Sequence, residues 1–529
     1  MSYSLTEKIM NGHKRIQEGF SDLKGRLGRP GKEEILEGNI LKVMFKLGWP
    51  IMIATFLRTL YNLADTVWLG RLTGPEATYS VAAASQAWSV VFIIMSVEIG
   101  FGVAALALIS QYIGSDKFDK ASEYAGQIYF LAITFSILFA AIGYLGTPYL
   151  LDLLTGAGAE GEALASYGTD YLRIIFLGLP FMFLFFVFMF VMRGRGDNVT
   201  PMKIVAVAAV LNIIVDPILI LGSGHAVSLG SLEFTIPTLF GYPIPSLGIR
   251  GAAIATVVTR ALGALYSVHL IFSNKLEICM DPSYLIPDVS KIKKILTVSI
   301  PSSFGRFGEA LGFLILWAVV YRLPNPDVAG AAYGAGNRIL NITFLVIGGV
   351  SMAMSTMIGQ SLGAEMQERT EKVARKGLIT LAVLGAAIAL PLFFARNVLI
   401  EFVVPGQEAV ISTGGELLMI FSLSLPFFCI FRGVTQIMAG SGHTFQQMIL
   451  NLGRIWGLRL VFVFLFALWL GMNDTGVWMG LSVSNLAAAG IALFVYSFGW
   501  WKEKVIEEAP TVKPKIPVEE EAENTDSNL

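Results

Sequence analysis

The sequence predicts an all-α integral membrane protein with twelve transmembrane helices in two pseudo-symmetric six-helix lobes. The first observation is compositional: of the 529 residues, 54% are hydrophobic and only 15% are charged, whereas soluble proteins carry about 25% charged residues. The second is that the apolar residues form long blocks. The third is that motifs in the first half of the chain recur, in the same order, in the second half.

The apolar blocks predict the membrane spans. A helix that crosses a bilayer needs about 20 consecutive, mostly apolar residues. Twelve blocks meet this requirement, and they leave no stretch long enough for a separate soluble enzyme domain. The predicted spans are 44–69, 80–109, 123–148, 169–192, 202–222, 249–273, 295–321, 330–358, 377–396, 414–439, 446–471 and 475–499.

The loops predict the orientation of the chain. Lysine and arginine accumulate in the N-terminus and in alternate loops, among them SDKFDKAS, RGRGDNVTPMK and QERTEKVARK, and again after the last span. Because basic residues stay on the cytoplasmic side, both termini are expected in the cytoplasm, and the number of spans is expected to be even. We expect a multi-pass protein of the cell membrane (plasma or inner membrane).

These spans divide the chain into five predicted regions. They are a cytoplasmic N-terminal extension (1–42), an N-lobe (43–274), a cytoplasmic linker (275–294), a C-lobe (295–500) and a disordered cytoplasmic tail (501–529). The first 24 residues carry a loose apolar stripe, which fits either a helix lying on the membrane surface or a partly ordered extension. The long external loop, 222–248, fits either a small hairpin or an unstructured loop.

The repeat predicts two related halves. GWPIMIATFLRTLY in the first span corresponds to SIPSSFGRFGEALG in the seventh, SQYIGSDKFDKASEYAGQ to GQSLGAEMQERTEKVARKG, and VMRGRGDNVTPM to IMAGSGHTFQQM, each roughly 250 residues apart. Halves of this kind place a substrate cavity at their interface in many secondary transporters.

An ordered set of motifs carries a family resemblance. YNLAD (61–65) in span one, MRGRGD (192–197) followed by TPM (200–202), and Asn212 with Asp216-Pro217 in span five resemble the multidrug and toxic compound extrusion (MATE) exporters over residues 40–500. The resemblance implies two six-helix lobes, a V-shaped cleft and cation-coupled drug efflux.

Two acidic residues lie within predicted spans, where a charged group is costly and therefore suggests a function. Tyr61 precedes Asp65 by one helical turn, and Asn212 precedes Asp216 by the same spacing, so each pair shares a helix face. Two neighbouring carboxylates do not both ionise easily, so such a pair is suited to hold a proton. The same oxygens of Asp65, Asn212 and Asp216 are suited to sodium once deprotonated.

The resemblance implies that these four residues form the cation-coupling site, with a hydroxyl from span six for which Thr256 is the candidate. The alternative is a structural role. In that case the Asp65 carboxylate is paired with Arg58 or with a helix end, and the Asp216 carboxylate has its hydrogen bonds satisfied at the Pro217 kink. Pro50 matches a proline that the family associates with bending of the first helix; a fixed kink is the alternative.

The C-lobe is predicted to differ from the N-lobe. Glu309 follows Pro301 at the spacing of an acid in the sodium-coupled branch of the family, but Arg432 stands in span ten where that branch has an aspartate. We therefore expect Glu309 to form a buried polar network with Arg306, Arg338 or Arg432. A role for those arginines with an anionic substrate stays open.

The predicted function is secondary active multidrug efflux by alternating access. Amphipathic organic cations or drugs leave in exchange for protons or sodium, with no cofactor and no resident metal beyond that coupling ion. We expect a monomer whose partners are small molecules and the lipid bilayer, with no nucleic acid. The alternatives are a flippase for lipid-linked precursors, disfavoured by few in-membrane arginines, and an integral-membrane enzyme, for which no catalytic motif is found.

Overall fold

The computed structural model describes residues 28–506 apart from 156–157, 230–231, 237, 239–241 and 274–275. Within that part of the chain, twelve helices are long and apolar enough to cross a membrane, which is the number that the apolar blocks predict. The amphipathic segment at the start of the chain and the tail beyond residue 506 lie outside the described residues.

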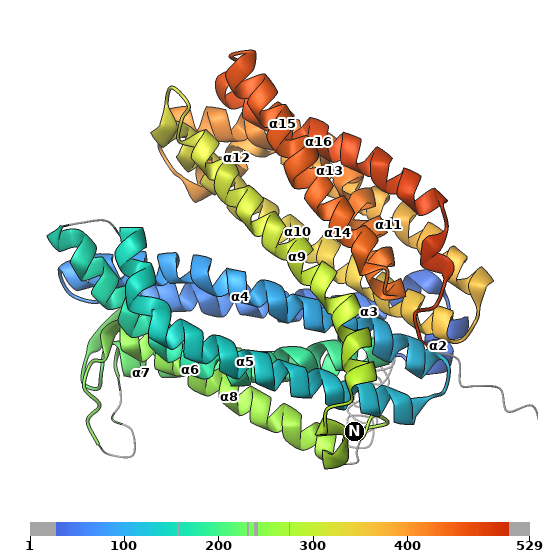
Figure 1. The fold of residues 1–529 in the computed structure, drawn as a ribbon. Coiled ribbons are helices and arrows are strands. Elements are labelled where there is room, and N and C mark those ends of the chain that lie inside the picture. Colours follow the sequence, from blue (N-terminus) through green and yellow to red (C-terminus); the bar gives the residue numbers. More distant parts are fainter. Residues whose placement is uncertain are drawn as a thin grey trace, which may run out of the picture.

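The first six long helices form one bundle, coloured blue to green in Figure 1. They follow the short helix α2 (Lys32–Glu37) and are α3 (Ile40–Leu69), α4 (Pro75–Gly114), α5 (Phe118–Thr155), α6 (Ala159–Arg195), α7 (Val199–Ile220) and α8 (Gly248–Phe272). Between α7 and α8, strands β1 (Ala226–Leu229) and β2 (Leu232–Thr235) pair antiparallel. Of the two alternatives for the external loop, the structure therefore has the hairpin.

The second bundle begins after the 3-10 turn η1 (Pro282–Leu285). Its elements are α9 (Val289–Val320), α10 (Pro326–Gly363), α11 (Gln367–Phe394), α12 (Arg396–Val403), α13 (Glu408–Ser441), α14 (Thr444–Leu452), η2 (Gly453–Arg459), α15 (Leu460–Val463), η3 (Phe464–Trp469), α16 (Asn473–Ser497) and η4 (Trp500–Lys502). The segments α14 to η3 form one continuous span, Thr444–Trp469, in which η2 and η3 are π-helical.

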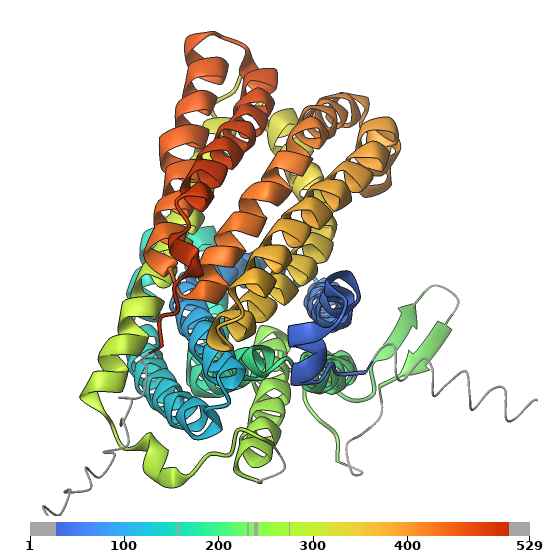
Figure 2. The same cartoon turned by 90° about the vertical axis from the view of Figure 1, so that its right-hand side faces the viewer.

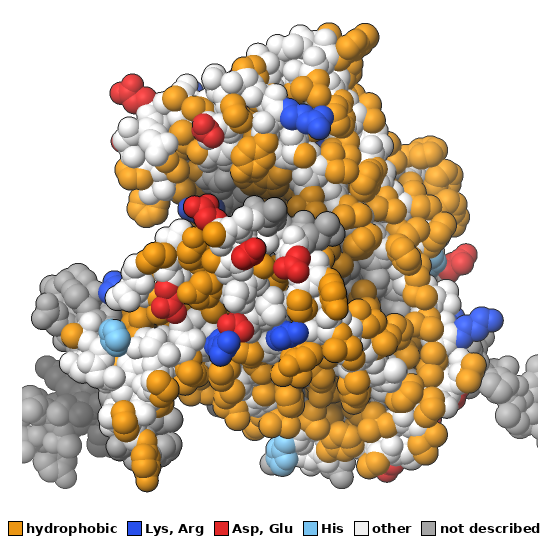
Figure 3. Space-filling model, turned by 60° about the vertical axis from the view of Figure 1, so that its left-hand side comes forward, with side chains coloured by type: hydrophobic (Ala, Val, Ile, Leu, Met, Phe, Trp, Pro, Cys, Tyr) orange, Lys and Arg blue, Asp and Glu red, His pale blue; other side chains and the backbone are white. Residues whose placement is uncertain are grey.

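The two bundles diverge at one end and meet at the other, so that the molecule is V-shaped (Figures 1 and 2). Hydrophobic side chains cover much of the outer face of both bundles, and a hollow separates them (Figure 3). An apolar outer surface of this kind is what a lipid environment requires, because backbone groups are satisfied within each helix.

Two helices belong to both hydrophobic cores. The first turns of α3, from Ile40 to Leu47, pack into the C-lobe core, whereas Ala54 to Leu69 pack into the N-lobe core. In α9 the order is reversed: Ile295 and Val298 pack with the N-lobe, and Leu316 to Val320 pack with the C-lobe. The lobes are thus joined by their first helices as well as by the linker.

Both ends of the described part of the chain contribute to this junction. Ile35 of α2 is fully buried in the C-lobe core, and Arg369 donates hydrogen bonds to the carbonyls of Ile35 and Gly38. Trp501 is 1% exposed, and Ile506 packs into the N-lobe core. Residues 501–506, which the sequence assigns to the disordered tail, are therefore ordered, because Trp501 and Ile506 bury apolar surface.

At the closed end, α4 and α10 touch backbone to backbone. A Cβ atom on Gly363 would lie 1.9 Å from the carbonyl oxygen of Gln111, and one on Gly114 would lie 2.1 Å from that of Gln360. Only glycine permits so close an approach. These residues occupy equivalent positions in the sequence repeat, so equivalent segments of the two halves contact each other across the lobe interface.

Candidate functional site

The residues predicted for cation coupling are brought together inside the N-lobe. Tyr61 and Asp65 project from α3, Asn212 and Asp216 from α7, and Thr256 from α8. Helix α7 packs against both α3 and α8, which places the three helix faces around one point. Asp216 is fully buried, Asn212 and Thr256 are 2% and 3% exposed, and Asp65 is half-buried, so most of the group lies away from bulk solvent.

The site is rich in oxygen acceptors that lack a donor. Asn212 Nδ2 donates to Asp216 Oδ1 at 3.0 Å, and the Asp65 carboxyl interacts with Asp216 and is close to Thr256. Yet Asp65 Oδ1, Asp216 Oδ2, Asn212 Oδ1 and Thr256 Oγ1 are buried without a hydrogen-bond partner among the described residues. Unsatisfied buried polar groups are rare and call for an explanation. Carboxylate, amide and hydroxyl oxygens are the ligands that hard cations prefer.

A small cavity of about 30 Å³ adjoins Asp65, with Asn62, Ser85 and Tyr171 in its wall. A water molecule needs about 10–15 Å³ of such space, so this cavity accommodates a hydrated proton or one small ion. Asn62 also lines the larger N-lobe cavity, as do Tyr61 and Asn212, so the candidate site adjoins both cavities.

Arg260, one turn after Thr256 on α8, is a site residue that the sequence patterns did not predict. Its guanidinium donates to the Tyr61 hydroxyl, lies 5.6 Å from the centre of that ring, and is the cation in electrostatic contact with Asp65. The alternative partner for Asp65, Arg58, instead approaches Met189, with Nη2 3.8 Å from the sulfur. The missed signal was present: an arginine in an apolar span, four residues from a predicted site residue.

The N-lobe cavity has a volume of about 240 Å³ and is mainly apolar. Its charged lining is Glu98 with Arg58 and Arg260, and α6 contributes methionines and phenylalanines to its wall: Met182, Phe183, Phe185, Phe186 and Met189. Methionine and aromatic side chains adapt to ligands of varied shape, so this surface suits hydrophobic molecules.

Glu309 lies between two arginines of the C-lobe, of which Arg306 is one of the three expected partners and Arg454 is not. Arg306 Nη1 donates to its carboxylate at 3.1 Å, and Arg454 Nη2 donates at 2.7 Å. Arg338 is exposed, and Arg432 lines the same cavity without an ion pair to Glu309 among the described residues. Arg454 was missed because it lies on a span whose apolar residues dominate its pattern.

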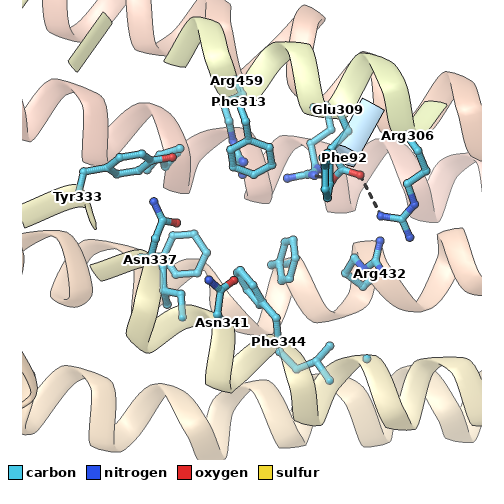
Figure 4. Close-up of a pocket in the computed structure, with 18 of the residues that line it drawn as sticks. Phe92, Arg306, Glu309, Phe313, Tyr333, Asn337, Asn341, Phe344, Arg432 and Arg459 are labelled. Carbon is cyan, nitrogen blue, oxygen red and sulfur yellow. Dashed lines mark hydrogen bonds and ion pairs between the residues drawn. The ribbon is translucent and has the colours of Figure 1, made fainter. Parts of the chain in front are cut away.

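The expectation that few arginines lie within the membrane spans is therefore wrong for the C-lobe. Four arginines, Arg306, Arg432, Arg454 and Arg459, line one C-lobe cavity of about 420 Å³ (Figure 4). They come from α9, α13 and η2, which are far apart in sequence. In the sequence, Arg306 and Arg432 each lie alone among the apolar residues of their spans, and Arg454 and Arg459 lie five residues apart in a third span.

Comparison with known proteins identifies the family. The MatE family model matches residues 50–218 and 301–465, one match in each lobe and together more than half of the chain. The chain belongs to the MATE family. The fold and the family resemblance expected from the sequence are thereby confirmed.

The chain is similar along most of its length to bacterial MATE transporters. It is 27% identical to the probable multidrug resistance protein YpnP of Bacillus subtilis, over 89% of this chain and 97% of that protein. It is 26% identical to a FAD transporter of Shewanella oneidensis, over 87% of this chain and 95% of that protein. A MOP superfamily transporter from Pyrococcus furiosus has the same fold, with a TM-score of 0.78 and 21% identity over 89% of this chain and 98% of that one.

In this MATE-family chain, Pro50 lies inside α3, between the part of the helix that packs with the C-lobe and the part that packs with the N-lobe. A proline removes one hydrogen bond of the helix and permits a bend. Eleven positions later the same helix carries Tyr61. Any bend at Pro50 therefore changes the angle between the acidic site and the C-lobe.

Proposed function

We propose that this chain is a secondary active antiporter that exports amphipathic organic cations or drugs in exchange for protons or sodium. The observation that carries the proposal is the buried group of Asp65, Asp216, Asn212 and Thr256, four of whose oxygens have no donor among the described residues. An entering proton would join two of these oxygens, and a sodium ion would be coordinated by several of them, so occupancy would change the energy of this site.

Cation binding must favour one arrangement of the lobes over the other to drive transport. The site lies between α3, α7 and α8, and α3 continues through Pro50 into the C-lobe core. A carboxyl pair that holds a proton can approach more closely than one in which both groups are ionised. We propose that this approach shifts α3 relative to α7 and that Pro50 transmits the shift to the C-lobe.

The substrate is proposed to be amphipathic because the N-lobe cavity combines apolar and charged lining. The name of the Bacillus subtilis relative, a probable multidrug resistance protein, supports the export of drugs. The Shewanella oneidensis relative is named a FAD transporter, and FAD carries negatively charged phosphates, so the names of the relatives do not all refer to cations.

The positive-inside pattern of the loops supports a cytoplasmic position for both termini. The cleft between the lobes then opens to the outside, on the side of the β1–β2 hairpin (Figure 1). The protein is proposed to act in the cell membrane as a monomer, since each chain holds both lobes and its own acidic site.

The two alternatives are weaker. The small number of arginines expected within the spans disfavours a flippase for lipid-linked precursors, which needs a basic cavity. The four arginines that line the C-lobe cavity remove that objection. The names of the relatives nevertheless support export of small molecules. For an integral-membrane enzyme, transporter relatives offer no support.

The decisive experiment is transport in proteoliposomes with an imposed pH or sodium gradient and ethidium as the exported cation. Asp65→Asn and Asp216→Asn should each abolish gradient-driven transport while leaving the protein folded. Asp152→Asn is the matched control, because Asp152 is an exposed acid of the same lobe. Normal pumping by both site variants would overturn the proposal.

A further inference from the structure

The C-lobe cavity has a large excess of positive charge. It is enclosed by α9, α10, α13, α16 and η2, with α4 closing one side through Phe92 and Ile99. Among its described lining residues, four are arginines and Glu309 alone is acidic. Buried charges in proteins are normally paired, so this excess of three positive charges needs a counter-charge.

The arginines differ in how they are held. Glu309 accepts from Arg306 at 3.1 Å and from Arg454 at 2.7 Å, so one carboxylate serves two guanidinium groups. Arg459 donates to Asn485 Oδ1 at 2.7 Å, which fixes its position without neutralising it. The Arg432 carbonyl accepts from the Thr435 hydroxyl at 3.0 Å, but its guanidinium has no hydrogen bond or ion pair to any residue that the structure describes.

The guanidinium of Arg432 lies beside that of Arg306, which is hydrogen-bonded to Glu309. Arg306 and Arg432 approach the same end of the cavity from α9 and α13 (Figure 4). Two planar guanidinium groups that converge on one point match the geometry of a carboxylate or a phosphate, which accept several hydrogen bonds at once.

A local irregularity in the helix supplies the other two arginines. Arg454 and Arg459 both lie in η2, a π-helical segment, in which residues five apart are joined by i→i+5 hydrogen bonds. In a regular α-helix, residues at this spacing would point to different sides. The π-helix places both side chains on the cavity side, 3% and 4% exposed. Such segments occur frequently at functional sites.

The rest of the lining is mainly aromatic and aliphatic. Phe92, Phe313, Phe344 and Phe428 contribute rings, and Asn337 and Asn341 on α10 present amide groups (Figure 4). Ring faces favour a flat, apolar ligand body, and a cavity of about 420 Å³ is within the range of small-molecule sites, about 300–1,000 Å³.

We propose that the C-lobe cavity binds an amphipathic organic anion, with its aromatic body against the phenylalanines and its carboxylate or phosphate on Arg432 and Arg306. This inference rests on the proposed function as an exporter and revises its substrate class, because it assigns anionic drugs rather than organic cations to the C-lobe cavity. The acids of the coupling site lie in the other lobe, so substrate and coupling ion do not compete for the same groups.

Equilibrium binding to the purified full-length protein in nanodiscs tests the inference without requiring transport. Riboflavin 5′-phosphate and riboflavin are the matched probes, since they share a fluorescent aromatic ring system and differ by the phosphate alone. The wild type should bind the phosphate ester about tenfold to a hundredfold more tightly, as expected for hydrogen bonds to a charged group. Arg432→Gln should remove most of that preference, and Arg432→Lys should retain part of it.

Arg338→Gln is the matched control, because it removes the same charge from an exposed position of the same lobe; it should leave the preference unchanged. Asp65→Asn should also leave it unchanged, so a failure of the coupling proposal is distinguishable from a failure of this one. Equal binding of the two flavins by the wild type, an unaltered preference in Arg432→Gln, or tighter binding of the cation ethidium than of the phosphate ester would overturn the inference.

Discussion

Two glutamines at equivalent positions of the repeat link the lobes at their closed end. Gln111 on α4 donates to the carbonyl of Ser441 at 3.0 Å and accepts from the Val505 amide at 2.9 Å, and Gln360 on α10 donates to the carbonyl of Gly194 at 2.9 Å. Both glutamines are fully buried. We predict that replacing both with alanine favours the arrangement in which this end is open.

The magnitude follows from what each glutamine satisfies. Gly194 and Ser441 lie in the last turns of α6 and α13, whose carbonyls have no partner within the helix. In the closed arrangement, alanine leaves these carbonyls buried and unpaired, whereas water can reach them once the lobes separate. At about 1 kcal/mol for each bond, the double variant loses about 2 kcal/mol of preference for the closed end. That is a shift of about 30-fold in the equilibrium.

Pulsed electron paramagnetic resonance measures this shift. Spin labels at Lys120 and Gln367, which are exposed near the starts of α5 and α11, report the separation of the lobes at the closed end. Both native cysteines, Cys279 and Cys429, are replaced beforehand. We expect a second, longer distance in the double variant that is absent or minor in the parent protein.

Gln127→Ala is the matched control. Gln127 is also buried, and it donates to the carbonyls of Tyr284 and Ile286 at 2.7 and 2.6 Å, so it joins α5 to the linker and not to the other lobe. Its replacement should lower the melting temperature without adding the longer distance. An unchanged distance distribution in the double variant, or the same change in Gln127→Ala, would refute the reasoning.

Three further predictions concern packing, buried charge and pH. Gly363→Ala should populate the open arrangement of the same end in the spin-label assay, because its Cβ would lie 1.9 Å from the Gln111 carbonyl oxygen; an unchanged distribution would show that α4 and α10 can part without opening the lobes. Glu309→Gln should lower the free energy of unfolding by about 3 kcal/mol, because it leaves the buried Arg454 and the half-buried Arg306 without their shared carboxylate; denaturation of the purified protein checks this. Outside the membrane spans, the hydrogen bond from Arg195 holds the pKa of Glu277 below its ordinary value. A carboxylate with a lowered pKa stabilises the fold above its unfolded-state pKa, about 4.3, and loses this contribution as the pH falls through the lower folded-state pKa. Glu277→Gln should therefore flatten the dependence of melting temperature on pH between about 3 and 5, and an unchanged profile would contradict the assignment.

The predicted spans agree with the observed helices to within several residues at most of their ends, because an apolar block of sufficient length can cross the bilayer as little else than a helix. The differences are helices that extend beyond the block, for example by ten residues at the starts of α6 and α11 and by five at the ends of α4 and α10. Helix α4 runs to Gly114 and α10 to Gly363, past the predicted ends at 109 and 358, because their last turns pack against each other at the closed end.

The candidate coupling residues were predictable because each carries a local anomaly. Asp65 and Asp216 are acids in apolar spans with a polar residue one turn before each. Their proximity was not predictable from that pattern, since it depends on α3 and α7 packing side by side. The contact of Arg260 with Tyr61 also depends on how these helices pack, so the sequence did not predict it.

The sequence by itself determined the number of spans, the two related halves and the unusual acids of the first half. Each is a local property, set by the cost of placing polar groups in hydrocarbon. Only the tertiary structure decided that four isolated arginines share one cavity, that α3 and α9 each serve both cores, and that equivalent glutamines cross the interface. These features depend on which faces of distant helices meet, and a single helix contains no information about the partner that covers it.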